Sequence, residues 1–256
     1  IVAADELHPP CARSLLGRVA FCESNCFHRF GAVAVKDIAA RSRDSQVTKP
    51  LPRPLKEKLL WLANALADMK PKVIDCMAEK RPIILFTDGA AESSDPAVLS
   101  FDVVTIGAVA IDTVDGSMCH FGDRVPDKIV EEWRAGGILQ VICQAEVYPV
   151  TLAKVLLGDN WSRRRVIAFI DNDAARFSLI NSNSGSEAIG DLLLVNAALD
   201  AKLDLACWYE RVASESNIAD LPSRLKFEEL NEMGSSWVEC DHPDTIKGWK
   251  KHLTGL

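Results

Sequence analysis

A chain of 256 residues, 48% of them hydrophobic, can bury one large core, or one core with an appended segment. No apolar run approaches the roughly 20 residues that a membrane helix needs, and no signal peptide opens the chain. The eight cysteines include no Cys-x-x-Cys pair. We therefore expect a reduced, intracellular protein of the cytoplasm or nucleus that does not enter a membrane.

The charge is unevenly distributed along the chain. The net charge is −7, but residues 1–80 hold 13 Lys and Arg against 9 Asp and Glu, a balance of +4. The remaining residues hold 16 against 27, a balance of −11. An acidic domain can bind a polyanion where cations cover some of its carboxylates, so any nucleic-acid surface should be local.

Residues 1–79 are predicted to form a helical segment with a proline-rich linker. Apolar residues recur at helical spacing over 11–43, although Gly17 and Gly31 interrupt them. Three alternating prolines within 49–54 predict an extended connector. A leucine stripe over 55–66 then predicts a second helix, which ends before Pro71.

From residue 80 the pattern becomes that of an α/β domain. We expect a mixed five-stranded sheet with flanking helices over 80–226, followed by a polar C-terminal tail over 227–256 without a clear period. Pro149 is expected in the first turn of one helix, where proline is tolerated. The predicted strands are 83–86, 103–111, 119–121, 166–170 and 205–212, and the predicted helices are 125–134, 146–157, 174–180 and 187–199.

Four acidic residues lie at the ends of elements in this pattern. Asp88 and Asp171 each end an apolar strand, Glu146 lies near the start of a helix, and Asp220 lies just past the last strand. Taken singly, each has a commoner explanation as a turn former, a helix cap or a solvated charge. Together they are candidate ligands for Mg²⁺, and two such ions can activate a water and stabilise a leaving oxygen.

The segments around these acids resemble the ribonuclease H domain of retroelement reverse transcriptases. The series is Phe86-Thr87-Asp88-Gly89-Ala90, Gln144-Ala145-Glu146, Phe169-Ile170-Asp171-Asn172, and Ser216-Asn217-Ile218-Ala219-Asp220-Leu221-Pro222-Ser223-Arg224. The resemblance implies a ribonuclease H-like fold and an endonuclease that cuts the RNA strand of RNA–DNA hybrids. It also implies two Mg²⁺ or Mn²⁺ ions held by Asp88, Glu146, Asp171 and Asp220.

Residues 1–79 resemble the thumb and connection region that precedes ribonuclease H in such polyproteins. The matching stretches are residues 14–21 and 61–66. No Tyr-x-Asp-Asp polymerase signature occurs in the chain. Since the chain begins with Ile1 instead of Met, we expect the polymerase portion of the polyprotein to lie upstream.

The sequence departs from the family pattern in three places. Many members carry a His just before the position of Asn217, where this chain has Ala213-Ser214-Glu215-Ser216. The 58 residues from Asp88 to Glu146 include an extra segment, 126–134. Arg163-Arg164-Arg165 is the basic run of the domain, and it is as consistent with a solvated turn as with a phosphate contact.

Two alternatives to the hybrid-cutting nuclease stay open. The domain could be a weakly active or inactive scaffold that binds nucleic acid or protein, although the four intact acids argue against it. It could also be another nuclease of the same superfamily, which the Asn217–Asp220 segment disfavours.

Finer assignments concern two neighbouring acids and two cysteine motifs. Asp171 is expected to bind metal, whereas Asp173 is expected to cap the following helix. The motif Cys22-x-x-x-Cys26-x-His28 could suggest a zinc site, but no fourth ligand follows at motif spacing, so core packing is the better interpretation. The case for zinc at Cys240-Asp241-His242 is weaker still.

Overall fold

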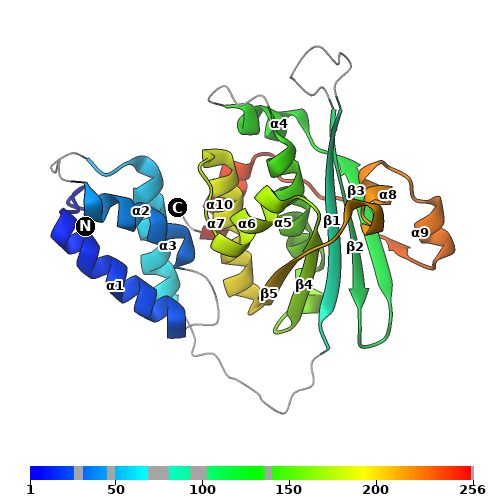
Figure 1. Ribbon diagram of the computed structural model, residues 1–256, viewed down its shortest axis with the longest axis horizontal. Helices are drawn as coiled ribbons and strands as arrows, with labels where there is room; N and C mark the ends of the chain where they lie inside the picture. Colours follow the sequence, from blue (N-terminus) through cyan, green and yellow to red (C-terminus); the bar gives the residue numbers. More distant parts are fainter. Residues whose placement is uncertain (26–30, 45–49, 69–80, 93–102, 136–139, 255–256) are drawn as a thin grey trace.

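A six-stranded mixed sheet forms the centre of the protein, with helices on both of its faces (Figure 1). The computed structural model describes residues 1–25, 31–44, 50–68, 81–92, 103–135 and 140–254. The strand order is β5-β4-β1-β2-β3-β6, and it confirms the predicted fold class with one additional strand. The strands are β1 (Ile83–Glu92), β2 (Val103–Asp112), β3 (Met118–Arg124), β4 (Arg165–Ile170), β5 (Ala206–Arg211) and β6 (Ser236–Trp237).

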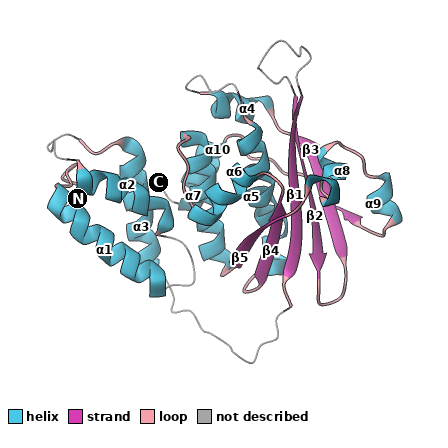
Figure 2. Ribbon diagram, viewed as in Figure 1, coloured by secondary structure: helices cyan, strands magenta, loops and turns pink. Residues whose placement is uncertain are grey.

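The first three strands form the predicted antiparallel meander, since β2 pairs antiparallel with both β1 and β3. In contrast, β4 runs parallel to β1 and to β5, and β6 runs parallel to β3. The helices that connect or cover these strands are α4 (Asp127–Arg134), α5 (Ile142–Trp161), α6 (Asp173–Asn181), α7 (Glu187–Leu203), α8 (Asp220–Ser223), α9 (Glu228–Glu232) and α10 (Ile246–Thr254). Figure 2 shows α5 and α7 on one face of the sheet and α8 on the other.

The described part of the N-terminal segment contains three helices where the sequence predicted two. They are α1 (Pro9–Asn25), α2 (Ala32–Arg43) and α3 (Arg53–Asp68). The single helix predicted over 11–43 is therefore wrong, because α1 ends at Asn25 and α2 begins after Gly31. The extended connector is also shorter than predicted: α3 starts at Arg53 and holds Pro54 in its first turn, where the missing N–H has no intrahelical partner to lose. Residues 45–49 and 69–80, which include Lys49 and Pro71, lie outside the described residues.

Helix α7 lies between two hydrophobic cores. Its Leu192, Leu193 and Val195 belong to the core between the sheet and α5. Its Leu194, Ala197 and Ala198 belong to the core that it shares with α1, α2 and α3. A helix covered on both sides has little need of a polar face, which explains the nearly continuous apolar run in α7. The N-terminal helices therefore pack directly onto the sheet domain.

The C-terminal segment is part of the folded structure. No period was visible after Arg224, yet α9, β6 and α10 form there, and β6 extends the sheet beside β3. The Lys250 ammonium on α10 contacts Glu57 Oε2 of α3 at 2.6 Å and Asp191 Oδ1 of α7 at 2.7 Å. These two ion pairs join three helices that are distant in sequence. Among the described helices, none is both long and apolar enough to cross a membrane.

Candidate metal centre on strand β1

Three carboxylates predicted from the sequence lie together in the structure. Each of Asp88, Glu146 and Asp171 offers an oxygen within 4.8 Å of the oxygens of the other two. Asp88 and Glu146 are buried, and Asp171 is half-buried. Buried carboxylates are expensive unless a cation or hydrogen-bond donors accompany them. This cluster is therefore the strongest candidate for a functional site among the described residues.

Strand register brings Asp88 and Asp171 to neighbouring positions. Strands β1 and β4 are parallel, and their last paired residues are Phe86 and Phe169. Asp88 and Asp171 each lie two residues further along, on the same side of their strands. The prediction that Asp88 ends its strand is wrong, because β1 continues to Glu92 in its pairing with β2. It is β4 that stops, at Ile170, and this leaves β1 open on that side beside Asp88.

Glu146 reaches this opening from α5, on the opposite face of the sheet from α8. A Cβ on Gly89 would lie 2.5 Å from the Ala145 carbonyl carbon and 2.8 Å from the Glu146 nitrogen, so only glycine permits this approach. The helix starts at Ile142, four residues earlier than predicted, and Pro149 lies inside it instead of in its first turn. Since proline has no N–H, the carbonyl of Ala145 loses its intrahelical donor at the point where α5 meets Gly89.

A second close approach fixes the segment that carries Asp220. Gly107 of β2 pairs with Asp88 on one side and with Gly122 of β3 on the other. A Cβ on Gly107 would lie 2.2 Å from the Ser223 nitrogen, and one on Gly122 would lie 2.1 Å from the Pro222 carbonyl oxygen. Two glycines side by side thus form a flat patch on which α8 rests, next to Asp88.

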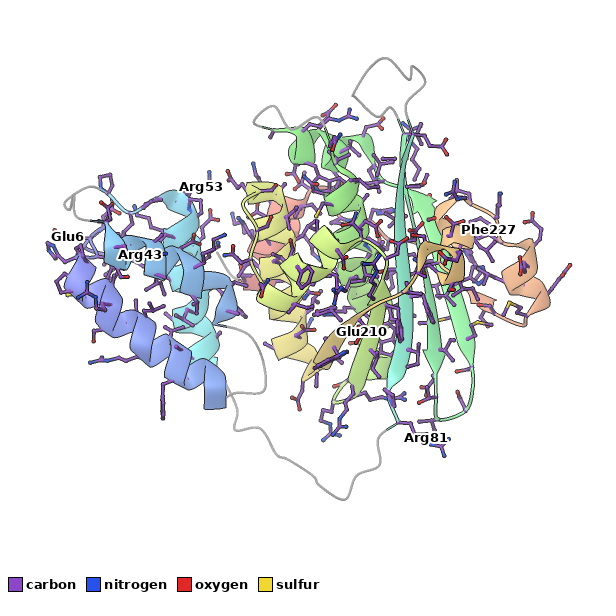
Figure 3. The ribbon with its side chains drawn as sticks, viewed as in Figure 1. Glu6, Arg43, Arg53, Arg81, Glu210 and Phe227 are labelled. Atoms are coloured by element: carbon purple, nitrogen blue, oxygen red, sulfur yellow. The ribbon has the colours of Figure 1, made fainter. Side chains whose placement is uncertain are left out.

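Hydrogen bonds from this segment hold the strand around Asp88. The Ser223 hydroxyl donates to Asp88 Oδ2, and the Asn217 side-chain amide donates to the Thr87 carbonyl at 3.0 Å. Both residues are buried. Just beyond α8 lies Phe227, which is labelled in Figure 3. Its ring stacks on that of His120 of β3. Ser223 and Asn217 lie within the segment that carries the family resemblance, but no sequence pattern predicted their contacts with Asp88 and Thr87.

Asp220 stands apart from the three clustered acids. It is the first residue of α8, and its Oδ1 accepts a hydrogen bond from Arg224 Nε at 2.8 Å. Its side chain is 45% exposed. Its negative charge nevertheless raises the pKa of Asp88, which places it within electrostatic range of the cluster. The structure thus brings oxygens of three of the four predicted acids within 4.8 Å of one another and holds the fourth acid in an ion pair with Arg224.

The electrostatics of the cluster favour a cation. Burial raises the pKa of Glu146 to about 9, and the charges of Asp88 and Asp171 add to that effect, although a hydrogen bond from the Gly89 backbone lowers it. Burial likewise raises the pKa of Asp88, against the hydrogen bond from Ser223. Among the described residues, none forms a hydrogen bond with the buried Glu146 Oε2. An unpartnered oxygen among three carboxylates fits a hard divalent cation such as Mg²⁺ or Mn²⁺.

The start of α6 corrects one assignment. Asn172, not Asp173, is the N-cap of α6, and its side-chain oxygen accepts a hydrogen bond from the Ala175 N–H at 3.0 Å. Asp173 is the first helical residue and forms ion pairs with Arg176 and Arg211. Asp173 is therefore engaged away from the cluster, as expected, but by a different interaction from the predicted one.

The basic run before β4 takes part in an internal ion pair. The Arg164 guanidinium bonds both carboxylate oxygens of Asp112, at the end of β2, and donates to the Arg81 carbonyl at 2.8 Å. This arrangement supports the interpretation of the run as a turn before a strand. Ser214, Glu215 and Ser216, where the family often has a His, form an exposed 3₁₀ turn.

No protein-family model matches the sequence, and no curated protein matches it. Solved structures similar to the chain include a ribonuclease H1 from the halophilic archaeon Halobacterium salinarum NRC-1, with 15% sequence identity and a TM-score of 0.44 over 59% of this chain and 99% of that one. Another is the N-terminal ribonuclease H domain of Rv2228c from Mycobacterium tuberculosis, with 12% identity and a TM-score of 0.40 over 60% and 99%. A third is LC9-RNase H1, with 12% identity and a TM-score of 0.42 over 67% and 82%.

Proposed function

We propose that the chain is a ribonuclease H-type endonuclease that hydrolyses the RNA strand of RNA–DNA hybrids. The observation that carries the proposal is the cluster of Asp88, Glu146 and Asp171, whose oxygens lie within 4.8 Å of one another. Three carboxylates at this spacing, two of them buried, suit divalent cations and little else. The motif order along the sequence supplies the substrate class.

The residues of the site have separable tasks under this proposal. Asp88, Glu146 and Asp171 hold Mg²⁺ or Mn²⁺, and Asp220 completes a site for two ions from the start of α8. Bound divalent ions supply activation of a water and stabilisation of the leaving oxygen. Ser223 orients the Asp88 carboxylate through its hydrogen bond, and Asn217 anchors the Asp220 segment to β1. In the proposal this chain is part of a retroelement reverse transcriptase that also has a polymerase portion.

One observation favours the alternative of a weakly active or inactive scaffold. Asp220 is paired with Arg224 and stands outside the cluster of three acids. If that ion pair persists when a cation is present, the site has one ligand fewer than the family pattern. Binding of hybrid without its cleavage would be the result expected of such a scaffold.

Cleavage of end-labelled substrates tests the proposal directly. RNA–DNA hybrid, duplex RNA, duplex DNA and single strands are each incubated with the full chain and Mg²⁺, Mn²⁺ or a chelator. We expect cutting of the RNA strand of the hybrid, with either metal and not with the chelator. Cleavage that persists with the chelator, or that is equally fast on single strands, would contradict the proposal. Binding of the hybrid is measured in parallel. Binding without cleavage indicates the scaffold, whereas neither binding nor cleavage indicates an unrelated protein.

A further inference from the structure

A second group of side chains of metal-ligating types lies on the β3–β6 side of the sheet. Asp123 is near the end of β3, whereas Cys240 and His242 belong to the segment between β6 and α10. Their ligand atoms all lie within 4.8 Å of one another. That segment leaves the sheet edge and crosses to the helix side, where α10 packs beside α7 (Figure 1).

The imidazole of His242 is held in an orientation suited to metal binding. Its Nδ1 is 2.9 Å from the Tyr148 hydroxyl, and the two rings stack at 5.8 Å. The side chain is only 9% exposed, and the other ring nitrogen, Nε2, is buried at 3.3 Å from Asp123 Oδ2. A metal-ligating His commonly donates its second N–H to a neighbouring group, as Nδ1 can to Tyr148.

We propose that Asp123, Cys240 and His242 bind a zinc ion that fastens the C-terminal segment to the sheet. One sulfur, one nitrogen and one oxygen are all donors that Zn²⁺ takes, and a water can complete a tetrahedral shell. A thiolate ligand disfavours Mg²⁺ and Ca²⁺, which distinguishes this group from the carboxylate cluster. Binding replaces the Cys240 S–H bond with an S–Zn bond and releases one proton to solvent.

The charges of the group agree with this assignment. A Cys240 thiolate and the Asp123 carboxylate carry two negative charges, which one Zn²⁺ neutralises. A packed thiol with no metal role is the competing explanation, and it predicts no metal binding.

The position of the site gives the metal a structural role. Tyr148, which contacts His242, follows Glu146 by two residues on α5 and also meets Trp249 of α10 edge to face. A zinc ion at His242 would therefore brace α5 and α10 together through Tyr148. Because only two residues of β6 pair with β3, the segment has few backbone hydrogen bonds of its own to hold it in place.

Cobalt substitution in the full chain tests the proposal, because Co²⁺ bound by a thiolate gives a charge-transfer absorption that carboxylate sites lack. Protein stripped with a chelator is titrated with Co²⁺ and then with Zn²⁺. We expect one equivalent of Co²⁺ to give the thiolate band and four-coordinate visible bands, and Zn²⁺ to displace them. Cys240→Ser should abolish the thiolate band, and His242→Gln should weaken binding at least tenfold.

Two variants serve as matched controls. Cys119→Ser changes a different partly buried thiol, which lies on β3 outside the proposed zinc site, and Asp88→Asn alters the carboxylate cluster. Both variants should keep the thiolate band. Zn²⁺ should raise the melting temperature of the parent and of Asp88→Asn, but not that of Cys240→Ser. If Cys240→Ser does not fold, Asp123→Asn, at a more exposed position, replaces it and should weaken cobalt binding. A parent protein without the thiolate band, or Cys240→Ser with it, would overturn the proposal.

Discussion

The side-chain amide of Asn217 donates a hydrogen bond to the carbonyl oxygen of Thr87 at 3.0 Å, and so joins two segments that are 130 residues apart in sequence. Thr87 immediately precedes Asp88, and Asn217 precedes Asp220 by three residues. The bond sets the distance between the β1 acid and the α8 acid. Buried amide hydrogen bonds of this kind are costly to break, since both groups lose their partners.

We expect Asp88→Asn to reduce hybrid cleavage by roughly a hundredfold or more, since bound cations contribute several kcal/mol to such reactions. The amide has nearly the same shape and can still accept the hydrogen bond from Ser223, so the fold should persist. Cleavage rates and thermal melting are measured together. Asp115→Asn, in the exposed turn between β2 and β3, is the control and should leave cleavage unchanged. An active Asp88→Asn protein would place the reaction elsewhere.

The stability of the metal-free protein should depend on Glu146. Burial and two neighbouring carboxylates raise its pKa from an ordinary value of 4.5 to about 9. Between these two values the folded state keeps a proton that the unfolded state has released, so stability should fall as the pH rises through this window. At pH 8 in chelator, the free energy of unfolding of Glu146→Gln should therefore exceed that of the parent by at least about 1 kcal/mol. The variant should accordingly melt at a higher temperature.

The exposed glutamate Glu131 on α4 provides the control for this measurement, because Glu131→Gln should leave the pH dependence of melting as it is in the parent. Millimolar Mg²⁺ should reverse the order and make the parent more stable relative to Glu146→Gln. If the two proteins melt alike at pH 8 in chelator, the carboxylates do not repel one another in the way that the geometry implies.

The sequence could locate the clustered acids because Asp88 and Asp171 follow apolar strands and Glu146 lies in a helix between them. The sequence-based predictions were wrong about element boundaries that depend on tertiary packing. Neither the extension of β1 beyond Asp88 nor the position of Pro149 inside α5 is visible without the partner strands and Gly89. Gly107 and Gly122 carry no sequence signal of the helix that rests on them. Asp123 meets Cys240 and His242 only through the pairing of β6 with β3.

The residues at and just before the start of α6 allow helix capping to be tested separately from metal binding. Asn172→Ala should cost about 1 kcal/mol of stability, because it removes the side-chain oxygen that accepts from Ala175. Asp173→Ala breaks partly exposed ion pairs with Arg176 and Arg211 and should cost at most about 1 kcal/mol. Asp171→Asn should instead abolish cleavage with little loss of stability. A stable but inactive Asp173→Ala protein would reverse the roles of the two aspartates.

The glycine patch under α8 should be intolerant of any side chain. In Gly107→Ala the new methyl group would lie 2.2 Å from the Ser223 nitrogen, so α8 must move away from β2. We expect a loss of about 1–3 kcal/mol, as for other overpacked sites, and a larger proportional loss of cleavage because Ser223 leaves Asp88. Gly190→Ala on α7, where the added carbon meets nothing within 4 Å, should be neutral or stabilising. Equal behaviour of the two variants in melting and cleavage would contradict this account.

The 3₁₀ turn before Asn217 offers a test of the missing histidine. Ser214 and Ser216 are both exposed, so a histidine fits at either position without displacing the core. A serine hydroxyl does not titrate near neutral pH, whereas an imidazole does and can exchange protons there. We expect Ser214→His or Ser216→His to raise the turnover number on RNA–DNA hybrid, with the rise confined to the pH range in which the imidazole titrates. Ser214→Gln and Ser216→Gln are controls of similar size that cannot titrate. A rise that the glutamine variants share would show a steric effect, and no rise in either histidine variant would mean that turnover here is not limited by proton exchange at this turn.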